Sequence, residues 1–360
     1  MKRIIAGTAA ALLAAVLFLP QTARAVSARS AIVLDAVSGR ILYEKDADRQ
    51  SLIASTTKIM TALIICQQCN VLDRMRIPAE AVGIEGSSMY LREGEVLTLQ
   101  ELLYGLMLSS GNDAALALAI YCGGTVEGFV QMMNDKARLL GLEDTHFENP
   151  NGLDAPGHYS TARDLAVLAA YAMEDPIFSK TVSSRTVTVG ERHLRNHNKL
   201  LWLTEGADGV KTGYTKAAGR VLVSSATRNG RRIVAVTIDA PDDWTDHQKL
   251  LEEGFSRYSM HQVVRRGTPV GSLDVAGGDA QVTVYASDDY YYALAPDEQV
   301  HLVLPGPGFV YAPVAAGGDA GVVYVTVQGK AVGKIPVYYG RTVERAPEEP
   351  KNFFQKLIGG

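Results

Sequence analysis

A serine and a lysine stand three residues apart in the stretch Ala54-Ser55-Thr56-Thr57-Lys58. Three residues make almost one helical turn, so in a helix the lysine amine can reach the serine oxygen. The run that follows, residues 59–65, is apolar nearly all round, which predicts a helix buried in a core. Burial lowers the pKa of a lysine, and a neutral lysine accepts a proton. The pair therefore predicts an activated nucleophile, Ser55, with Lys58 as its proton acceptor.

Two further polar motifs follow in order, Ser110-Gly111-Asn112 and Lys211-Thr212-Gly213. Alone, Ser-x-x-Lys also fits a helix-capping serine followed by a surface lysine. Together, the three motifs resemble the signature of penicillin-binding proteins and class A β-lactamases, in which the serine of Ser-x-x-Lys is the nucleophile. The combination favours the catalytic interpretation over the capping one.

The second and third motifs need elements that position them. Ser110 and Asn112 fall on a tight link between two apolar helical stretches, residues 101–108 and 114–120, where Gly111 permits an unusual backbone. Gly213 falls in a β-rich segment. A glycine in a strand marks a place where another backbone comes close, and for an edge strand we expect that backbone to be a peptide substrate.

Glycine-containing turns organise the remaining strands of the first part of the chain. Two strands, residues 31–34 and 41–43, are joined by a turn at Gly39, and two longer ones, residues 220–227 and 231–239, by Asn229-Gly230, which is typical of a β-hairpin. From about residue 262 the pattern changes to short alternating strands separated by Gly, Pro and Asp. It predicts a second, all-β domain with the role of a stalk or spacer. The expected strands are residues 263–264, 281–285, 300–304, 322–327 and 335–339.

Both ends of the chain carry targeting signals. Residues 1–25 combine a basic start, an apolar run and Ala23-Arg24-Ala25, the pattern of a cleaved secretory signal peptide. The protein is expected to be exported, to the periplasm or the outer face of the cytoplasmic membrane. In the last 15 residues, four apolar side chains share one helical face beside lysines, which predicts weak, peripheral membrane contact: Phe353, Phe354, Leu357 and Ile358.

Composition excludes some functions. A formal net charge of −4 argues against nucleic acid as a partner. Cys66 and Cys69 have the spacing of a redox or metal pair, but no second pair completes a zinc site, so we interpret them and Cys122 as small residues packed in or near the core. We expect no metal and no cofactor.

The chain resembles the D-alanyl-D-alanine carboxypeptidases, low-molecular-mass penicillin-binding proteins that trim the terminal D-alanine from peptidoglycan stem peptides. The resemblance implies a mixed α/β (α+β) fold of the DD-peptidase/β-lactamase type, with an antiparallel five-stranded sheet flanked by helices, followed by a small all-β domain. The expected divisions are a catalytic domain over residues 26–260, a β-rich domain over 261–345, and a linker with its tail over 346–360. Beside the three motifs, the matching stretches are residues 151–154, 160–164 and 208–213.

The same resemblance assigns a role to each site residue. Ser55 forms the acyl-enzyme, Lys58 accepts its proton, and Ser110 relays a proton toward the leaving D-alanine. The other residues bind the substrate: Asn112 holds its amide, Lys211 and Thr212 meet its carboxylate, Gly213 and Tyr214 lie along it, and the N–H groups of Ser55 and Tyr214 form an oxyanion hole. Peptidoglycan stem peptides are the expected substrates, and β-lactam antibiotics the expected inhibitors.

Three alternatives remain at this stage. A β-lactamase needs a carboxylate-assisted water, typically in Glu-x-x-Leu-Asn, whereas Glu148 here precedes Pro150-Asn151-Gly152. A transpeptidase or endopeptidase would use the same serine. A catalytically silent peptidoglycan-binding protein is the non-enzymatic alternative, and the intact Ser55, Lys58, Ser110 and Lys211 argue against it.

Overall fold

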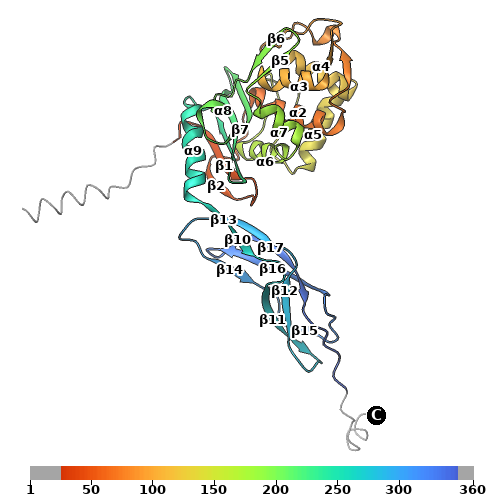
Figure 1. Ribbon diagram of the computed structural model, residues 1–360, viewed down its shortest axis with the longest axis vertical. Helices are drawn as coiled ribbons and strands as arrows, with labels where there is room; N and C mark the ends of the chain where they lie inside the picture. The colour runs from red at the N-terminus through yellow and green to blue at the C-terminus, as the bar shows by residue number, and fades with distance from the viewer. Residues whose placement is uncertain (1–25, 348–360) are drawn as a thin grey trace, which may run out of the picture.

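The computed structural model describes residues 26–347 and contains two regions, one of helices and sheet and one of strands (Figure 1). The predicted signal peptide and the predicted membrane-contacting tail lie outside the described residues. In the first region, helices cover an antiparallel sheet. In the second, strands alone build an elongated body that begins where the last long helix ends.

The central sheet has five antiparallel strands in the order β2-β1-β9-β8-β7, which confirms the predicted sheet. Its strands are β1 (Ser30–Asp35), β2 (Ile41–Lys45), β7 (Ala207–Thr215), β8 (Gly219–Arg228) and β9 (Arg231–Ile238). Asn229 and Gly230 both have positive φ, 51° and 77°, so the predicted hairpin turn between β8 and β9 is confirmed. The strand with the third motif, β7, is an edge strand, with one side open.

Side chains alternate between the two faces of this sheet. One face, with Ile32 and Val236, joins a large apolar core with most of the helices, and the other, with Val33 and Ala235, packs on the last long helix. The helices are α2 (Lys58–Gln68), α3 (Leu99–Leu108), α4 (Asn112–Gly123), α5 (Val126–Leu139), α6 (Ala162–Ala172), α7 (Pro176–Ser183), α8 (Leu200–Leu203) and α9 (Asp243–Arg257). Short elements complete the region: 3-10 helices η1 (Ala54–Thr57) and η2 (Ala79–Ala81), and strands β3 (Arg74–Arg76), β4 (Val96–Thr98), β5 (Thr186–Val189) and β6 (Arg192–Arg195).

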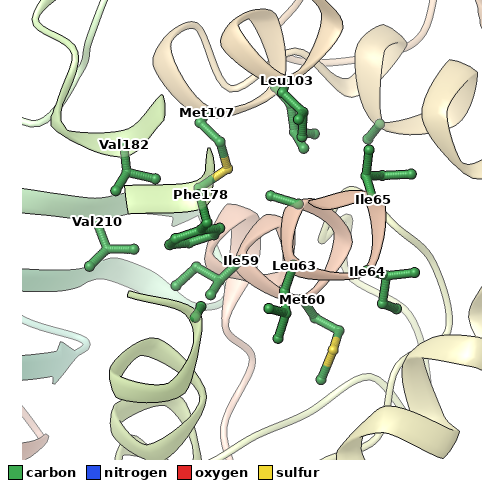
Figure 2. Packing of buried hydrophobic residues seen from close by; sticks show 14 of the residues in the cluster. Ile59, Met60, Leu63, Ile64, Ile65, Leu103, Met107, Phe178, Val182 and Val210 are labelled. Atoms are coloured by element: carbon green, nitrogen blue, oxygen red, sulfur yellow. The ribbon is translucent and has the colours of Figure 1, made fainter. Parts of the chain in front are cut away.

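The helix α2 lies at the centre of the core, as its sequence predicts. Residues 58–66 are all buried. Figure 2 shows α2 side chains enclosed by Leu103 and Met107 of α3, by Phe178 and Val182 of α7, and by Val210 of β7. A helix packed on every side has little freedom to shift, so the residue at its start, Lys58, has a fixed position. Within residues 26–347, no single helix is long and apolar enough to cross a membrane; one bent pair, α4 with α5, passes by length and composition.

The second region is built of strands around its own apolar core, which confirms the predicted all-β domain. A six-stranded sheet has the order β14-β16-β17-β12-β11-β15, and β10 pairs with β13. The strands are β10 (Ser259–Val264), β11 (Pro269–Ala276), β12 (Val282–Ala286), β13 (Tyr290–Leu294), β14 (Val300–Val303), β15 (Phe309–Tyr311), β16 (Asp319–Val327) and β17 (Lys330–Tyr339). The sequence predicted five of these strands and missed β11, β13 and β15.

An arginine from the first region is held by the second. Arg40, in the turn between β1 and β2, makes a two-pronged ion pair with Glu298, with both N···O distances 2.6 Å. It also donates to the carbonyl oxygen of Ala293, and its guanidinium lies over the rings of Tyr258 and Tyr292. Both charged side chains are nearly buried, 13% and 10% exposed. A shielded, bidentate pair of this kind fixes orientation as well as distance.

Candidate active site

The Ser-x-x-Lys motif has the geometry that its spacing predicts. Lys58 Nζ lies 3.0 Å from Ser55 Oγ, within hydrogen-bonding distance. One detail differs from the prediction: Ser55 stands in the 3-10 helix η1, and α2 begins only at Lys58. Ala54 has a positive φ of 47°, so the chain makes a sharp turn just before the serine. Ser55 stays partly exposed while Lys58 is completely buried, so a substrate can reach the serine but water does not reach the lysine.

Two oxygen acceptors hold Lys58 in addition to its contact with the serine. Its Nζ donates to Asn112 Oδ1 at 2.7 Å and to the backbone oxygen of Asn151 at 2.5 Å. The Asn112 amide is itself oriented, because its Nδ2 donates to the carbonyl of Glu85 at 2.6 Å. The structure thus brings together the first motif, the second motif and the loop around Asn151.

The electrostatic setting lowers the pKa of Lys58 well below its ordinary value. Burial is the largest cause, and the positive charge of Lys211 is the second; Asp113 acts in the opposite direction. A lysine in this setting gives up its proton far more readily than one at the surface. The prediction of a lowered pKa, made from the apolar helix alone, agrees with this direction.

The second and third motifs meet directly. Lys211 Nζ, on β7, donates to Ser110 Oγ at 3.1 Å and to the carbonyl of Thr212 at 2.8 Å. Burial lowers the pKa of Lys211 to about 7. One prediction about this turn is wrong: the unusual backbone lies at Ser110, with φ 60°, whereas Gly111 has an ordinary φ of −59°. Gly111 is needed for space, since a Cβ there would lie 2.7 Å from Asp113 Oδ1.

The edge strand β7 faces the serine turn. A Cβ on Gly213 would lie 3.1 Å from the backbone nitrogen of Ser55 and 3.1 Å from the carbonyl oxygen of Ile53. The prediction that another backbone approaches Gly213 is therefore confirmed, but the backbone belongs to this chain. A side chain at this position would push β7 away from the nucleophile.

A cleft of about 300 Å³ runs between the serine turn and β7. Five predicted site residues line it, Ser55, Ser110, Thr212, Gly213 and Tyr214, with Tyr214 largely exposed at the edge of the cleft. Lys58, Asn112 and Lys211 are buried and do not line the cleft. Lys58 contacts Ser55, Lys211 contacts Ser110, and Asn112 contacts Lys58 through the hydrogen bonds above. Residues that the sequence reasoning did not select also line the cleft: Ser87, His197, Arg220, Asp243 and Trp244.

The chain matches the family of D-alanyl-D-alanine carboxypeptidases (peptidase S11) over residues 18–242, and the C-terminal domain of penicillin-binding protein 5 over residues 258–345. The first match spans more than half of the chain. The chain belongs to the D-alanyl-D-alanine carboxypeptidase family.

Relatives of this carboxypeptidase cover almost its whole length. It is 31% identical over 336 residues to the D-alanyl-D-alanine carboxypeptidase DacF of Bacillus subtilis, covering 89% of this chain and 86% of the relative. It is 32% identical over 354 residues to DacA of Escherichia coli K12, covering 92% and 86%. Penicillin-binding protein 5 from Haemophilus influenzae superposes with a TM-score of 0.79 at 29% identity, covering 90% of this chain and 99% of that one. The serine-type D-Ala-D-Ala carboxypeptidase activity predicted from the motifs is therefore confirmed.

Two features of the carboxypeptidase site could not be selected by side-chain type. The first is the carbonyl of Asn151, since every residue carries such an oxygen. The second is Gly152, which has φ 84° and whose Cβ would lie only 2.0 Å from the Ala54 oxygen. The loop therefore packs its bare backbone against the serine turn, and only a glycine permits that. The motif Asn151-Gly152 was noted in the sequence as a matching stretch, without this role.

A buried histidine supports the serine turn from behind. His158 Nε2 lies 2.8 Å from Thr57 Oγ1, and its Nδ1 accepts from the backbone N–H of Glu148. Burial lowers the His158 pKa to about 4, so the ring is neutral at pH 7. The cysteines lie apart from the cleft: Cys66 is buried in α2, and burial raises its pKa to about 12. In residues 26–347, no cluster of three metal-ligating side chains is present.

Proposed function

We propose that this carboxypeptidase removes the terminal D-alanine from peptidoglycan stem pentapeptides through an acyl-enzyme on Ser55. The observation that carries the proposal is the buried Lys58, 3.0 Å from the serine oxygen and held by two acceptors. A neutral amine has two N–H donors and one lone pair. With the N–H groups directed to Asn112 Oδ1 and the Asn151 oxygen, the lone pair faces Ser55 Oγ. Lys58 is then placed to take the serine proton as the oxygen attacks the peptide carbonyl.

The proton then has a route to the leaving group. Ser110 Oγ and Lys211 Nζ lie within hydrogen-bonding distance of each other on the far side of the cleft. In the proposed step, the bond between the carbonyl carbon and the D-alanine nitrogen breaks and Ser110 passes its proton to that nitrogen, while the proton that Lys58 took from Ser55 is returned to Ser110. Lys211 in its charged form, with Thr212, binds the terminal carboxylate. The N–H groups of Ser55 and Tyr214 stabilise the oxyanion.

Hydrolysis of the acyl-enzyme completes the cycle, and its rate separates a carboxypeptidase from a β-lactamase. Among the residues that line the cleft, the one carboxylate is Asp243, and it is paired with Arg220 at 2.9 Å. Glu148 Oε1 lies 3.4 Å from the His146 ring. Neither arrangement supplies a base for rapid release of a bound β-lactam. A long-lived penicillin adduct is therefore expected.

The division of the chain belongs to the same proposal. We assign residues 26–260 to the catalytic domain, 261–345 to a β-rich spacer, and 346–360 to a linker with a weakly membrane-contacting tail. The change from α9 to strands at Ser259, and the two family matches on either side of residue 258, support these divisions. A peptidoglycan substrate requires that the protein be exported, to the periplasm or to the outer face of the cytoplasmic membrane.

Labelled penicillin and a synthetic pentapeptide test the proposal together. The wild-type protein should release D-alanine from the pentapeptide and should carry one stable penicillin adduct, mapped by mass spectrometry to Ser55. Ser55→Ala should lose both, by at least about 1000-fold in D-alanine release. Unchanged circular dichroism of the variant would exclude misfolding. An adduct on any other residue, or D-alanine release by Ser55→Ala near the wild-type rate, would overturn the assignment.

A further inference from the structure

A row of four basic side chains lies beside the cleft. From residue 193 to residue 200 exposed and buried residues alternate strictly. Within β6 the alternation follows from the extended backbone, and it continues through the bend at His197 to Lys199, directly before α8 begins. The exposed set is His193, Arg195, His197 and Lys199. The buried set is Leu194, Asn196, Asn198 and Leu200. Every basic residue of this stretch is therefore exposed to solvent, while the residues between them are buried.

The two buried asparagines fix this segment to the catalytic region. Asn196 Nδ2 donates to the carbonyls of Val182 and Ser184, at 3.1 and 3.0 Å. Asn198 Nδ2 donates to the carbonyl of Gly209, on β7, at 2.7 Å. The basic row is thus held by buried hydrogen bonds to α7 and to the strand that carries Lys211, and it has a defined place relative to the cleft.

An aromatic side chain completes a groove of about 630 Å³. Trp202, 39% exposed, has the guanidinium of Arg195 at 5.1 Å and that of Arg185 at 5.9 Å from its ring. Such cation–π contacts hold the arginines in position without neutralising their charge. The groove lining is Ser109, His193, Arg195, Asn196, His197, Lys199 and Trp202, a set without a carboxylate. A concave surface lined by the cations Arg195 and Lys199, with no carboxylate in its lining, is suited to an anionic ligand. Burial and the charge of Lys211 lower the pKa of His197, so that residue adds less positive charge.

The groove joins the catalytic cleft on the side of Lys211, away from Tyr214. His197 lines both, and Ser109 of the groove directly precedes Ser110 of the cleft. Along β7, Gly213 is the residue beside Ser55, while Lys211 and, before it, Gly209 lie toward Asn198 and the basic row. A substrate acylating Ser55 with its carboxylate at Lys211 and Thr212 therefore has its leaving group on the side of the groove. The rest of the donor peptide extends the other way, past Tyr214.

We propose that this groove is a binding subsite for an anionic group carried by the leaving portion of the peptide substrate. The inference rests on the proposed function, since that function sets the direction of the substrate. The chemistry is unchanged: the carbonyl carbon bonds to Ser55 Oγ, its bond to the leaving nitrogen breaks, and water later releases the acyl group. The subsite extends the substrate class from peptides that end in D-alanine to peptides whose leaving residue bears a second carboxylate.

Two substrates of equal size test this subsite. Each has the same acyl part ending in D-alanine, and the leaving residue is D-glutamate in one and D-glutamine in the other. The two leaving residues differ essentially in one charge. We expect kcat/KM to favour the D-glutamate substrate about fivefold, as for a well-placed charge at an exposed site. In the double variant Arg195→Gln/Lys199→Gln, the ratio should fall to about one.

A charge at the other end of β7 supplies the matched control. Lys216 is exposed and lies beyond Tyr214, on the donor side. Lys216→Gln removes one positive charge that belongs neither to the groove lining nor to the cleft lining, and should keep the fivefold ratio. Equal rates for the two substrates in the wild-type protein, or a ratio unaffected by the double variant, would overturn the subsite. Hydrolysis of a D-Ala-D-Ala peptide is measured in parallel: if the wild-type protein fails there, the proposed function fails and not the subsite alone.

Discussion

Two neighbouring sets of cations in this molecule differ in their exposure to water. Lys58 and Lys211 are completely or almost completely buried, and burial lowers the pKa of both. Arg195 and Lys199, which line the groove beside the cleft, are exposed. Burial makes it easier for a lysine to lose its proton, so a buried lysine can take part in proton transfer. An exposed guanidinium stays charged and can only attract anionic groups. Burial therefore lets Lys58 and Lys211 change their charge. The proposed mechanism uses this change for proton transfer at Lys58, and it makes carboxylate binding at Lys211 depend on pH, whereas the exposed set adds only charge.

The largest effect is expected where the buried lysine is replaced by a cation that cannot lose its proton. Lys58→Arg keeps the positive charge and much of the bulk, but a guanidinium does not act as a base at neutral pH. Penicillin acylation should fall at least about 1000-fold. The measurement is the second-order acylation rate with labelled penicillin. Lys216→Arg is the matched control and should acylate normally, because Lys216 is exposed and outside the cleft lining.

The alternative role for Lys58 makes the opposite prediction. If Lys58 acted only as a fixed charge that orients Ser55, then Lys58→Arg would keep substantial activity with the same pH profile. Acylation of this variant near the wild-type rate would show that burial at Lys58 serves orientation and not proton transfer.

The second effect is a dependence of kcat/KM on pH that we assign to Lys211. Its pKa is lowered to about 7 in the free protein, and its charged form is the one that binds a carboxylate. As pH rises through about 7, Lys211 loses its proton and its affinity for the substrate terminus. For the pentapeptide, kcat/KM should therefore fall above pH 7, approaching tenfold for each pH unit. The kcat profile should turn at a higher pH, since a bound carboxylate raises the Lys211 pKa.

Replacing Lys211 by arginine, which stays charged, tests whether Lys211 causes the decrease above pH 7. In Lys211→Arg the decrease above pH 7 should disappear, while kcat/KM at pH 7 falls about tenfold because a guanidinium does not reproduce the position of the lysine amine. A decrease above pH 7 that survives in Lys211→Arg would assign the alkaline limb to another group.

The smallest expected effect is a difference in salt dependence between the buried lysines, Lys58 and Lys211, and the exposed cations, Arg195 and Lys199. Exposed charges are screened over about 8–10 Å at physiological ionic strength, and buried ones much less. Raising NaCl from 0.05 to 0.5 M should reduce the D-glutamate over D-glutamine preference about twofold to fivefold. The rate with the D-glutamine substrate, which depends on the buried lysines, should change less. Equal salt sensitivity of the two rates would remove the distinction drawn here.

Much of the catalytic site was predictable from the sequence, because its chemistry depends on side-chain types at short spacing. Ser55 and Lys58 are linked by one helical turn, and the apolar run after them sufficed to predict burial and its effect on the lysine pKa. Ser110 and Lys211 were predicted as site residues by family resemblance. Their contact joins a helix turn to an edge strand 101 residues away, and no local pattern specifies such a distance.

What the sequence did not predict depends on the backbone and on tertiary placement. The Asn151 carbonyl and the positive φ of Ser110 carry no residue signature. The alternation of basic residues from His193 to Lys199 is visible in the sequence, but its nearness to the cleft follows from the bonds of Asn196 and Asn198. The strands β11 and β15 were missed because glycines and prolines border them, and because β15 is only three residues long.

The buried ion pair between Arg40 and Glu298 limits how the two regions can move relative to each other. A bidentate pair, packed between two tyrosine rings, resists both bending and twisting at the joint between the two regions. The β-rich region is therefore expected to move together with the first region and not independently of it. Any restraint on the far end of the β-rich region would then also restrain the position and the orientation of the cleft.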